Sequence, residues 1–300
     1  MTTKNKSKYF GAHTKNTLKE SRTKKFNKII KKLLLNLLLA YIAIGIFLYA
    51  FQTNIIYQPS DQDFYNCQGF SDYTPTQINS TRAYVKTNID NTTPDQVLVY
   101  FHGNAGRACD RSPLKYLFDQ LDKTIIFVEY TGYGNSTKKP SKKNLLQDSK
   151  NIAEHVIKNY DQATIIGQSI GSIIASHSAN LSNSTQLILI SPFNSIQQIA
   201  SQRYSIYPIN LMLKEDYNAK TYLENYKGNI KIIHAKQDYV VPASISIKHS
   251  QDLKNMNLNV SHTILNSTGH NSLWDSTEIS KIILNFVCED CLPEQSITYQ

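Results

Sequence analysis

The chain has 300 residues, of which 41% are hydrophobic and 18% charged, so it can bury a sizeable core and global disorder is not expected. Its formal net charge is +9, but residues 1–32 hold eleven lysines and arginines against one acid, Glu20. The rest of the chain is close to neutral. A nucleic-acid-binding domain needs a basic face on its folded part, and this distribution argues against one.

The basic tail, residues 1–32, runs directly into an uncharged apolar segment, residues 33–51. As a helix this segment would be about 28 Å long, close to a bilayer core of about 30 Å. The polar stripe of a buried soluble helix is missing, and the segment is longer than the apolar region of a cleaved signal peptide. We therefore expect a transmembrane anchor. The tail would then be cytoplasmic and contact anionic lipid, with residues 52–300 on the non-cytoplasmic side.

Four cysteines follow the anchor: Cys67, Cys109, Cys288 and Cys291. Export of this region would permit disulfides. The last two have C-x-x-C spacing, but no second pair lies at zinc-finger spacing, so neither a metal site nor another cofactor is expected. We favour an inert structural pair, with a local bridge or a bridge to Cys67 or Cys109 as the alternative.

Strand-like and helix-like patterns alternate along the rest of the chain. Continuous apolar or alternating runs predict strands at residues 82–87, 97–102, 124–128, 163–166, 187–190, 230–234 and 262–265. Helical patterns lie at residues 112–121, 142–159, 170–181 and 272–287. This order predicts an α/β fold with a mainly parallel sheet flanked by helices.

The same pattern sets the domain boundaries. One α/β domain is expected over residues 52–287, followed by a C-terminal tail, residues 288–300. Residues 192–228 are rich in Pro and Tyr, hold one short helical pattern and interrupt the alternation of strands and helices. They are the candidate for a short cap.

A serine stands between two glycines at the end of one predicted strand, in Gly167-Gln168-Ser169-Ile170-Gly171. Strand, sharp turn and helix in this order expose the serine hydroxyl at a helix N-terminus, where partial positive charge favours an oxyanion. Ser169 is therefore the candidate nucleophile. The alternative is a serine that only caps a helix.

A general base and an acid that orients it are expected at the same sheet edge. His270 directly follows the last strand region, which distinguishes it from the seven other histidines. Asp238 lies four residues beyond the strand that ends at His234, with Asp216 as its rival and an Asx-turn as its alternative role. The order Ser, Asp, His is typical of one hydrolase architecture.

The segment His102-Gly103-Asn104-Ala105-Gly106 ends a buried strand with small residues. Such a loop lets backbone amides approach a substrate oxygen. The expected oxyanion donors are the amides of Asn104 and Ile170. An ordinary glycine turn is the alternative.

Together with Tyr130–Ser136, Ser191–Ser195 and Asp238–Pro242, these motifs resemble the α/β-hydrolase fold. They are most similar to a single-pass group with an HGN-x-G oxyanion loop, which includes lysophospholipases, monoacylglycerol-type lipases and protein depalmitoylases and is also described as serine-aminopeptidase-like. The resemblance covers roughly residues 52–287. Thr131 stands where this group commonly has arginine, and Ala235 where glycine commonly follows the histidine.

The resemblance implies a membrane-anchored serine hydrolase that cleaves an ester or thioester without metal or cofactor. An acylglycerol, a lysophospholipid or an acylated protein would be the substrate, and Tyr133 and Phe193 are expected to contact it. One alternative is a peptidase, in which Glu215 and Asp216 grip a peptide N-terminus. Others are a catalytically silent anchored binding module and a tail that serves as a nucleic-acid arm.

Overall fold

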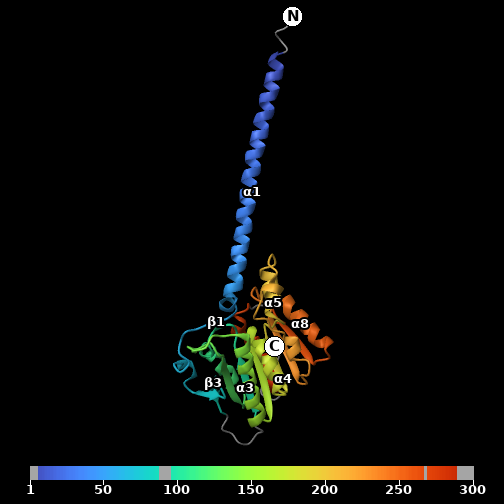
Figure 1. The fold of residues 1–300 in the computed structure, drawn as a ribbon. Helices are drawn as coiled ribbons and strands as arrows, with labels where there is room; N and C mark the ends of the chain where they lie inside the picture. Colours follow the sequence, from blue (N-terminus) through green and yellow to red (C-terminus); the bar gives the residue numbers. More distant parts are fainter. Residues whose placement is uncertain (1–5, 88–95, 267–268, 289–300) are drawn as a thin grey trace, which may run out of the picture. The chain divides into compact units, whose positions relative to one another are not determined.

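The computed structural model describes residues 6–87, 96–266 and 269–288. The chain divides into two compact units, Met1–Phe51 and Gln52–Gln300. Helix α1 (Lys6–Ile56) makes up the described part of the first unit (Figure 1). Its segment Lys24–Ile56 is long and apolar enough to cross a membrane, and most side chains of residues 33–51 are exposed. Helix α1 thus holds a candidate membrane span at the position predicted from the sequence.

The second unit is built on an eight-stranded sheet within the described residues, in the order β10-β9-β8-β7-β4-β6-β3-β2. Strands β2 and β3 pair antiparallel with each other, β3 pairs antiparallel with β6, and all other pairs are parallel. Two further short strands, β1 and β5, pair with each other in parallel. The strands are β1 (Gln58–Pro59), β2 (Thr74–Ile78), β3 (Thr81–Lys86), β4 (Gln96–Phe101), β5 (Ala105–Gly106), β6 (Thr124–Glu129), β7 (Gln162–Gln168), β8 (Gln186–Ile190), β9 (Asn229–Ala235) and β10 (Val260–Leu265).

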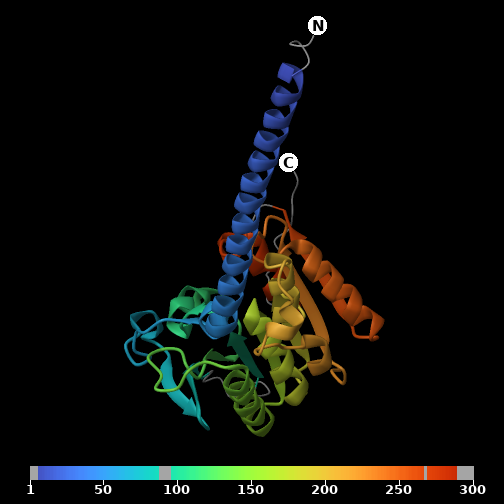
Figure 2. The ribbon, with the colours of Figure 1, turned by 45° about the horizontal axis from the view of Figure 1, so that its top comes forward.

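Helices cover both faces of this sheet. The first layer holds α3 (Lys142–Asn159) and α4 (Ile170–Leu181), which lie side by side (Figure 1), and α8 (Ala243–Asn255), which covers β9 and β10 (Figure 2). The second holds η2 (Ala108–Leu114), α2 (Lys115–Phe118) and α9 (Thr277–Val287). The second unit also contains two 3-10 turns, η1 (Gln68–Phe70) and η3 (Leu273–Asp275).

Strand β4 shows why both faces need a cover. Val97, Val99 and Phe101 belong to the core on the side of α3 and α4, whereas Leu98 and Tyr100 belong to the core on the side of α2 and α9. Successive strand residues point to opposite faces, so a continuous apolar run requires helices on both. The architecture predicted from the sequence, a mainly parallel sheet between helices, is confirmed.

The cap leaves the sheet after β8 and returns to it at β9. It contains three short helices, α5 (Ile196–Arg203), α6 (Ile209–Met212) and α7 (Ala219–Tyr222), where one helical pattern was expected. The Ala219 amide donates to the Asn194 carbonyl at 2.9 Å, which closes the segment on itself. The cap is therefore compact although it lacks a long helix.

Candidate active site

Four parallel strands bring the candidate site residues to one edge of the sheet. Asn104 follows β4, Ser169 follows β7, Asp238 follows β9 and His270 follows β10. The carboxyl ends of parallel strands share an edge, and ligands of open α/β sheets bind there. Residues separated by more than a hundred positions in the chain thus reach the same rim.

Ser169 occupies a strained turn between β7 and α4. Its φ of 55° and ψ of −122° are rare for a residue with a side chain. Both flanking glycines are required by close approach. A Cβ on Gly167 would lie 2.3 Å from the Gly171 carbonyl oxygen, and a Cβ on Gly171 would lie 2.3 Å from the His102 carbonyl oxygen. The turn can therefore hold this backbone only with glycine on both sides.

Asp238 and His270 form a close pair. The His270 Nδ1 lies 2.6 Å from Asp238 Oδ2, while the amides of Val240 and Val241 donate to Asp238 Oδ1 at 2.9 and 2.8 Å. Burial acts to raise the pKa of Asp238, but the hydrogen bond and charge of His270, with the Val241 amide, hold that pKa below its usual range. The carboxylate is thus kept ionised and aimed at the imidazole.

The rival acid, Asp216, lies in the cap and has another partner. Its Oδ1 accepts a hydrogen bond from the Gln197 amide at 3.0 Å, so it supports the first turn of α5. Among the described residues, the hydrogen bond recorded for the His270 ring is the one through Nδ1. Within the residues that the structure describes, this ring forms no hydrogen bond with the Ser169 hydroxyl. Such bonds are often long before substrate binds.

The loop after β4 lies against the serine. A Cβ on Gly103 would be 3.7 Å from the Cβ of Ser169. The Gly103 carbonyl lies 2.8 Å from His102 Nδ1, and in a trans peptide the following N–H points the opposite way. The amide of Asn104 is therefore directed away from the His102 ring. The amide of Ile170 is at the first position of α4, where a helix offers no backbone partner.

Comparison with known proteins supports this architecture. No family model matches the chain. A putative alpha/beta hydrolase of Acanthamoeba polyphaga mimivirus is 28% identical over 203 residues, which is 64% of this chain and 73% of that protein. An esterase from Pyrococcus furiosus superposes with a TM-score of 0.59 at 13% identity, over 77% of this chain and 97% of that one. Est1E from Butyrivibrio proteoclasticus, solved with ferulic acid bound, gives 0.56 at 15% identity, over 71% and 99%.

This chain has the α/β-hydrolase fold. The curated relatives that match first, from Mycobacterium tuberculosis, are 27% identical over 149 residues, and the match spans about half of their length, 53%. The fold agrees with the sequence-based resemblance. The turn that carries Ser169 follows β7, a central strand of the sheet, as the resemblance implies.

Two residues expected to contact substrate have a different place in this α/β-hydrolase domain. Tyr133 is 0% exposed, and its hydroxyl donates to the Asn104 carbonyl at 2.8 Å. Phe193 is 4% exposed and belongs to the core on the side of α3 and α4. Tyr133 and Phe193 were expected to contact substrate because they lie in motif segments, but such a motif does not show whether a side chain is buried. Tyr133 thus lies buried behind the loop that carries Asn104, and a contact of either residue with substrate stays a prediction.

Several supporting residues were not found by sequence reasoning. His234 Nε2 lies 3.5 Å from Asp238 Oδ2 and 2.8 Å from the Val241 carbonyl, and burial lowers its pKa, which favours a neutral ring. Gln168, next to the serine, accepts hydrogen bonds from Tyr100 at 2.8 Å and from Trp274 at 3.0 Å. Strand-end position hinted at His234, but the Gln168 contacts depend on tertiary packing alone.

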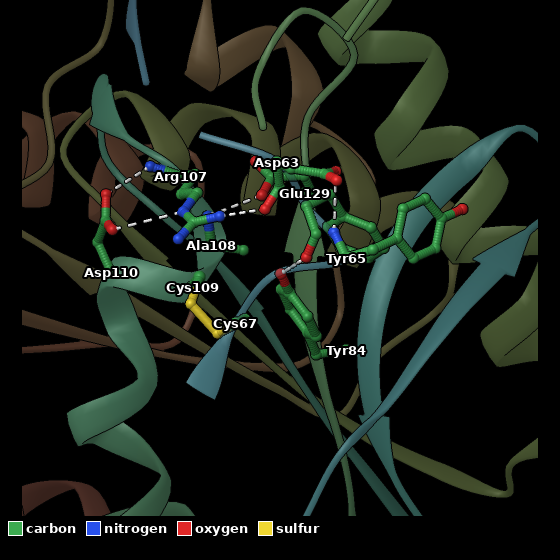
Figure 3. The surroundings of a disulfide bond; sticks show 10 residues. Asp63, Tyr65, Cys67, Tyr84, Arg107, Ala108, Cys109, Asp110 and Glu129 are labelled. Atoms are coloured by element: carbon green, nitrogen blue, oxygen red, sulfur yellow. Dashed lines mark hydrogen bonds and ion pairs between the residues drawn. A yellow bond between two sulfur atoms is a disulfide. The ribbon is translucent and has the colours of Figure 1, made fainter. Parts of the chain in front are cut away.

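A disulfide joins Cys67 to Cys109, just beyond the loop that carries Asn104 (Figure 3). Beside it, Arg107 donates to the Asp63 carbonyl, and the Ala108 amide donates to Glu129 at 3.1 Å. Cys288 is also disulfide-bonded, while Cys291 lies outside the described residues. A bridge between Cys67 and Cys109 was not among the pairings expected from the sequence, which all concerned Cys288 and Cys291.

The described residues contain no group of three or more His, Cys, Asp or Glu side chains that could hold a metal ion.

Proposed function

We propose that this protein is a serine hydrolase that cleaves an ester or thioester through an acyl-enzyme. The observation that carries the proposal is the pair of Asp238 and His270, 2.6 Å apart, at the sheet edge where Ser169 occupies its strained turn. The esterases among the solved structures of similar fold support this class of reaction. The proposed roles are those of a catalytic triad.

In the proposed reaction, His270 takes the proton of the Ser169 hydroxyl as its oxygen attacks the carbonyl carbon. Asp238 holds Nδ1 protonated, so Nε2 is the basic nitrogen. The amides of Asn104 and Ile170 stabilise the oxyanion of the tetrahedral intermediate. His270 then gives its proton to the leaving alcohol or thiol, which leaves an acyl group on Ser169. Water, activated by the same imidazole, releases the acid and restores the serine.

We further propose that the enzyme is anchored in a bilayer by residues 33–51 and acts on an acylated substrate at its surface. The disulfide between Cys67 and Cys109 supports export of the domain, because such bonds persist in oxidising compartments. The basic tail supports a cytoplasmic N-terminus. An acylglycerol, a lysophospholipid or an acylated protein fits this location.

The peptidase alternative has weaker support. Glu215 accepts hydrogen bonds from the Tyr57 hydroxyl at 3.0 Å and from the Lys142 amide at 2.5 Å, and Asp216 accepts one from Gln197. Both acids that were to grip a peptide N-terminus are thus engaged within the protein. An aminoacyl-amide substrate that is cleaved faster than an acyl ester would favour the peptidase.

The test is a comparison of Ser169→Ala with the wild type in hydrolysis of p-nitrophenyl butyrate. We expect the turnover number to fall by about 10⁴-fold or more, because triad members act as a unit. Labelling by a fluorophosphonate should be lost as well.

Ser178→Ala is the matched control. Ser178 is buried on the same helix α4, and its hydroxyl has no hydrogen-bond partner among the described residues. This variant should keep both turnover and labelling. Undiminished turnover in Ser169→Ala would rule out the proposed nucleophile, and an unlabelled wild type would favour a silent binding module.

A further inference from the structure

Gln52, the first residue after the apolar run, is hydrogen-bonded to the cap. Gln52 is only 8% exposed, and its amide group makes two hydrogen bonds with backbone of the cap. Its Nε2 donates to the Met212 carbonyl at 3.2 Å, and the Lys214 amide donates to its Oε1 at 2.6 Å. A buried side-chain amide paired on both atoms fixes the two segments against each other.

A second set of contacts lies one and a half turns further along the chain. The Tyr57 hydroxyl lies 2.5 Å from the Tyr217 hydroxyl and 3.0 Å from Glu215 Oε2. Both tyrosines are almost fully buried. The stretch from Gln52 to Tyr57 is thus held against residues 212–217 at both of its ends.

The cap carries exposed apolar side chains next to these contacts. We call residues 203–214 the cap tip. Leu211 is 80% exposed and Ile206 is 71% exposed, whereas Tyr207 and Ile209 between them are buried and attach the tip to the domain. The tip begins with Arg203, ends with Lys214 and contains no acid.

The cap tip contacts the residue that directly follows the apolar run. The apolar run ends at Phe51, and Gln52 contacts Met212, the residue after Leu211. If residues 33–51 span the bilayer as proposed above, Gln52 follows the last residue of the span directly, about 1.5 Å further along the helix axis. Exposed apolar side chains flanked by cations are what an interfacial membrane contact requires.

We infer that the cap tip is a second membrane contact, with Leu211 and Ile206 seated among the lipid headgroups of the bilayer that α1 crosses. The inference rests on the anchoring proposed above and not on the catalytic assignment. Because the cap starts at the carboxyl end of β8, this contact keeps the edge that carries Ser169 close to the membrane surface. A lipid-borne acyl chain would then reach the site without crossing bulk water.

The test places a fluorescent reporter at the tip in the full chain. The protein has one tryptophan, Trp274, so emission added by a second is readily separated by subtraction of the wild type. Leu211→Trp would be reconstituted in phosphatidylcholine vesicles, either plain or brominated on the upper acyl chain. Bromine quenches a nearby indole, and we expect most of the added emission to be lost in brominated vesicles.

Two matched variants make the result interpretable. Ile157→Trp places the reporter at a site 56% exposed near the end of α3, at the opposite edge of the sheet, and should not be quenched. Leu39→Trp places it inside the span and should be quenched strongly. Leu211 and Ile157 are both exposed, so the domain should tolerate a tryptophan at either position.

The inference is overturned if Leu211→Trp is quenched no more than Ile157→Trp while Leu39→Trp is quenched. In that case the tip faces water or another protein. It is also overturned if Leu39→Trp is not quenched, because α1 then does not cross the bilayer. The readout does not involve hydrolysis, so it stands even if the proposed nucleophile fails its own test.

Discussion

The buried ring of His102 contacts the loop that carries Asn104, and it shows how one side chain can set the direction of a backbone amide. A carbonyl can only accept, so the contact of 2.8 Å with Gly103 requires that Nδ1 carry a proton. Its Nε2 has no hydrogen-bond partner among the described residues and lies 3.7 Å from Glu129 Oε1. Both side chains are fully buried. His102 is thus a positioning residue for the Asn104 amide.

His102→Phe tests this role. The exchange removes the bond that holds the Gly103 carbonyl, so the Asn104 amide should lose its alignment with the oxyanion. Loss of one oxyanion donor typically costs 10²–10³ in rate, and we expect a fall in kcat of about 10–10² for misalignment, with KM unchanged. The melting temperature should change little, because the exchange also removes an unpartnered nitrogen. The measurement is kcat and KM with p-nitrophenyl butyrate, beside thermal unfolding.

His249→Phe is the control for this variant. His249 is equally buried on α8, and neither ring nitrogen has a partner among the described residues. Its exchange should leave kcat unchanged. If both variants lowered kcat alike, the effect would come from general loss of packing, and the positioning role of His102 would be rejected.

At the scale of elements, Asp148 joins α3 to the sheet. This buried carboxylate accepts hydrogen bonds from the Thr81 hydroxyl at 2.8 Å and from the amide and hydroxyl of Thr131 at 2.7 and 2.9 Å. Thr131 is the position where the resembling group commonly has arginine, and no cation is among these hydrogen-bond partners. Burial raises the pKa of Asp148 to about 6 in spite of these bonds.

Asp148→Asn should therefore change how stability depends on pH. The folded-state pKa lies above the unfolded value of 3.8, so the folded state binds more protons between pH 4 and 6. The wild type should lose stability relative to Asp148→Asn as pH rises through this window, by about 3 kcal/mol at most. Denaturant unfolding of the full chain in detergent between pH 4 and 7 measures the difference.

Asp72→Asn gives the opposite sign and serves as the control. The hydrogen bond from Lys115 lowers the pKa of Asp72 below the unfolded value of 3.8, so here the wild type should gain stability relative to the variant as pH rises toward 3.8, and this comparison is made below pH 4. Parallel pH profiles for the wild type and Asp148→Asn would contradict the assignment of a raised pKa to this carboxyl.

The elements differ in how well the sequence predicts them. Helices α3 and α4 were predicted at the bounds observed, because long periodic segments carry a strong signal. Helix α8 was not among the predicted helical ranges, because most of the side chains on its buried face are polar, with Ile245 and Leu253 beside Ser246, His249 and Ser250. Strand β2, with the sequence TPTQI, is largely polar and was missed. It forms at the sheet edge through its pairing with β3, which local sequence does not encode.

The residues of the candidate site also differ in how well the sequence predicts them. Ser169, Asp238 and His270 were chosen because each follows a strand, and strand ends of a parallel sheet share an edge. The contacts of His234 with Asp238 and of His102 with Glu129 join different strands or depend on burial. Only packing in three dimensions reveals these contacts, so a strand-by-strand analysis selects the candidate site residues and misses the residues that support them.

At the scale of the whole molecule, the disulfide between Cys67 and Cys109 closes a loop over a sequence separation of 42. The loop includes β2, β3 and β4 and the turn that carries Asn104. A cross-link of this length restricts the unfolded chain and typically stabilises by about 4 kcal/mol. It also ties the folding of the sheet edge to the redox state of the compartment.

The combined variant Cys67→Ser/Cys109→Ser should lower the free energy of unfolding by about 4 kcal/mol, and a reductant should lower that of the wild type by at least as much. Cys288→Ser serves as a comparison, because it removes a different disulfide and leaves the bridge between Cys67 and Cys109 intact. Denaturant midpoints with and without reductant provide the comparison. A double variant as stable as the wild type would mean that the bridge does not hold the fold, and that the packing of η2 against β6 suffices to keep the loop that carries Asn104 beside Ser169.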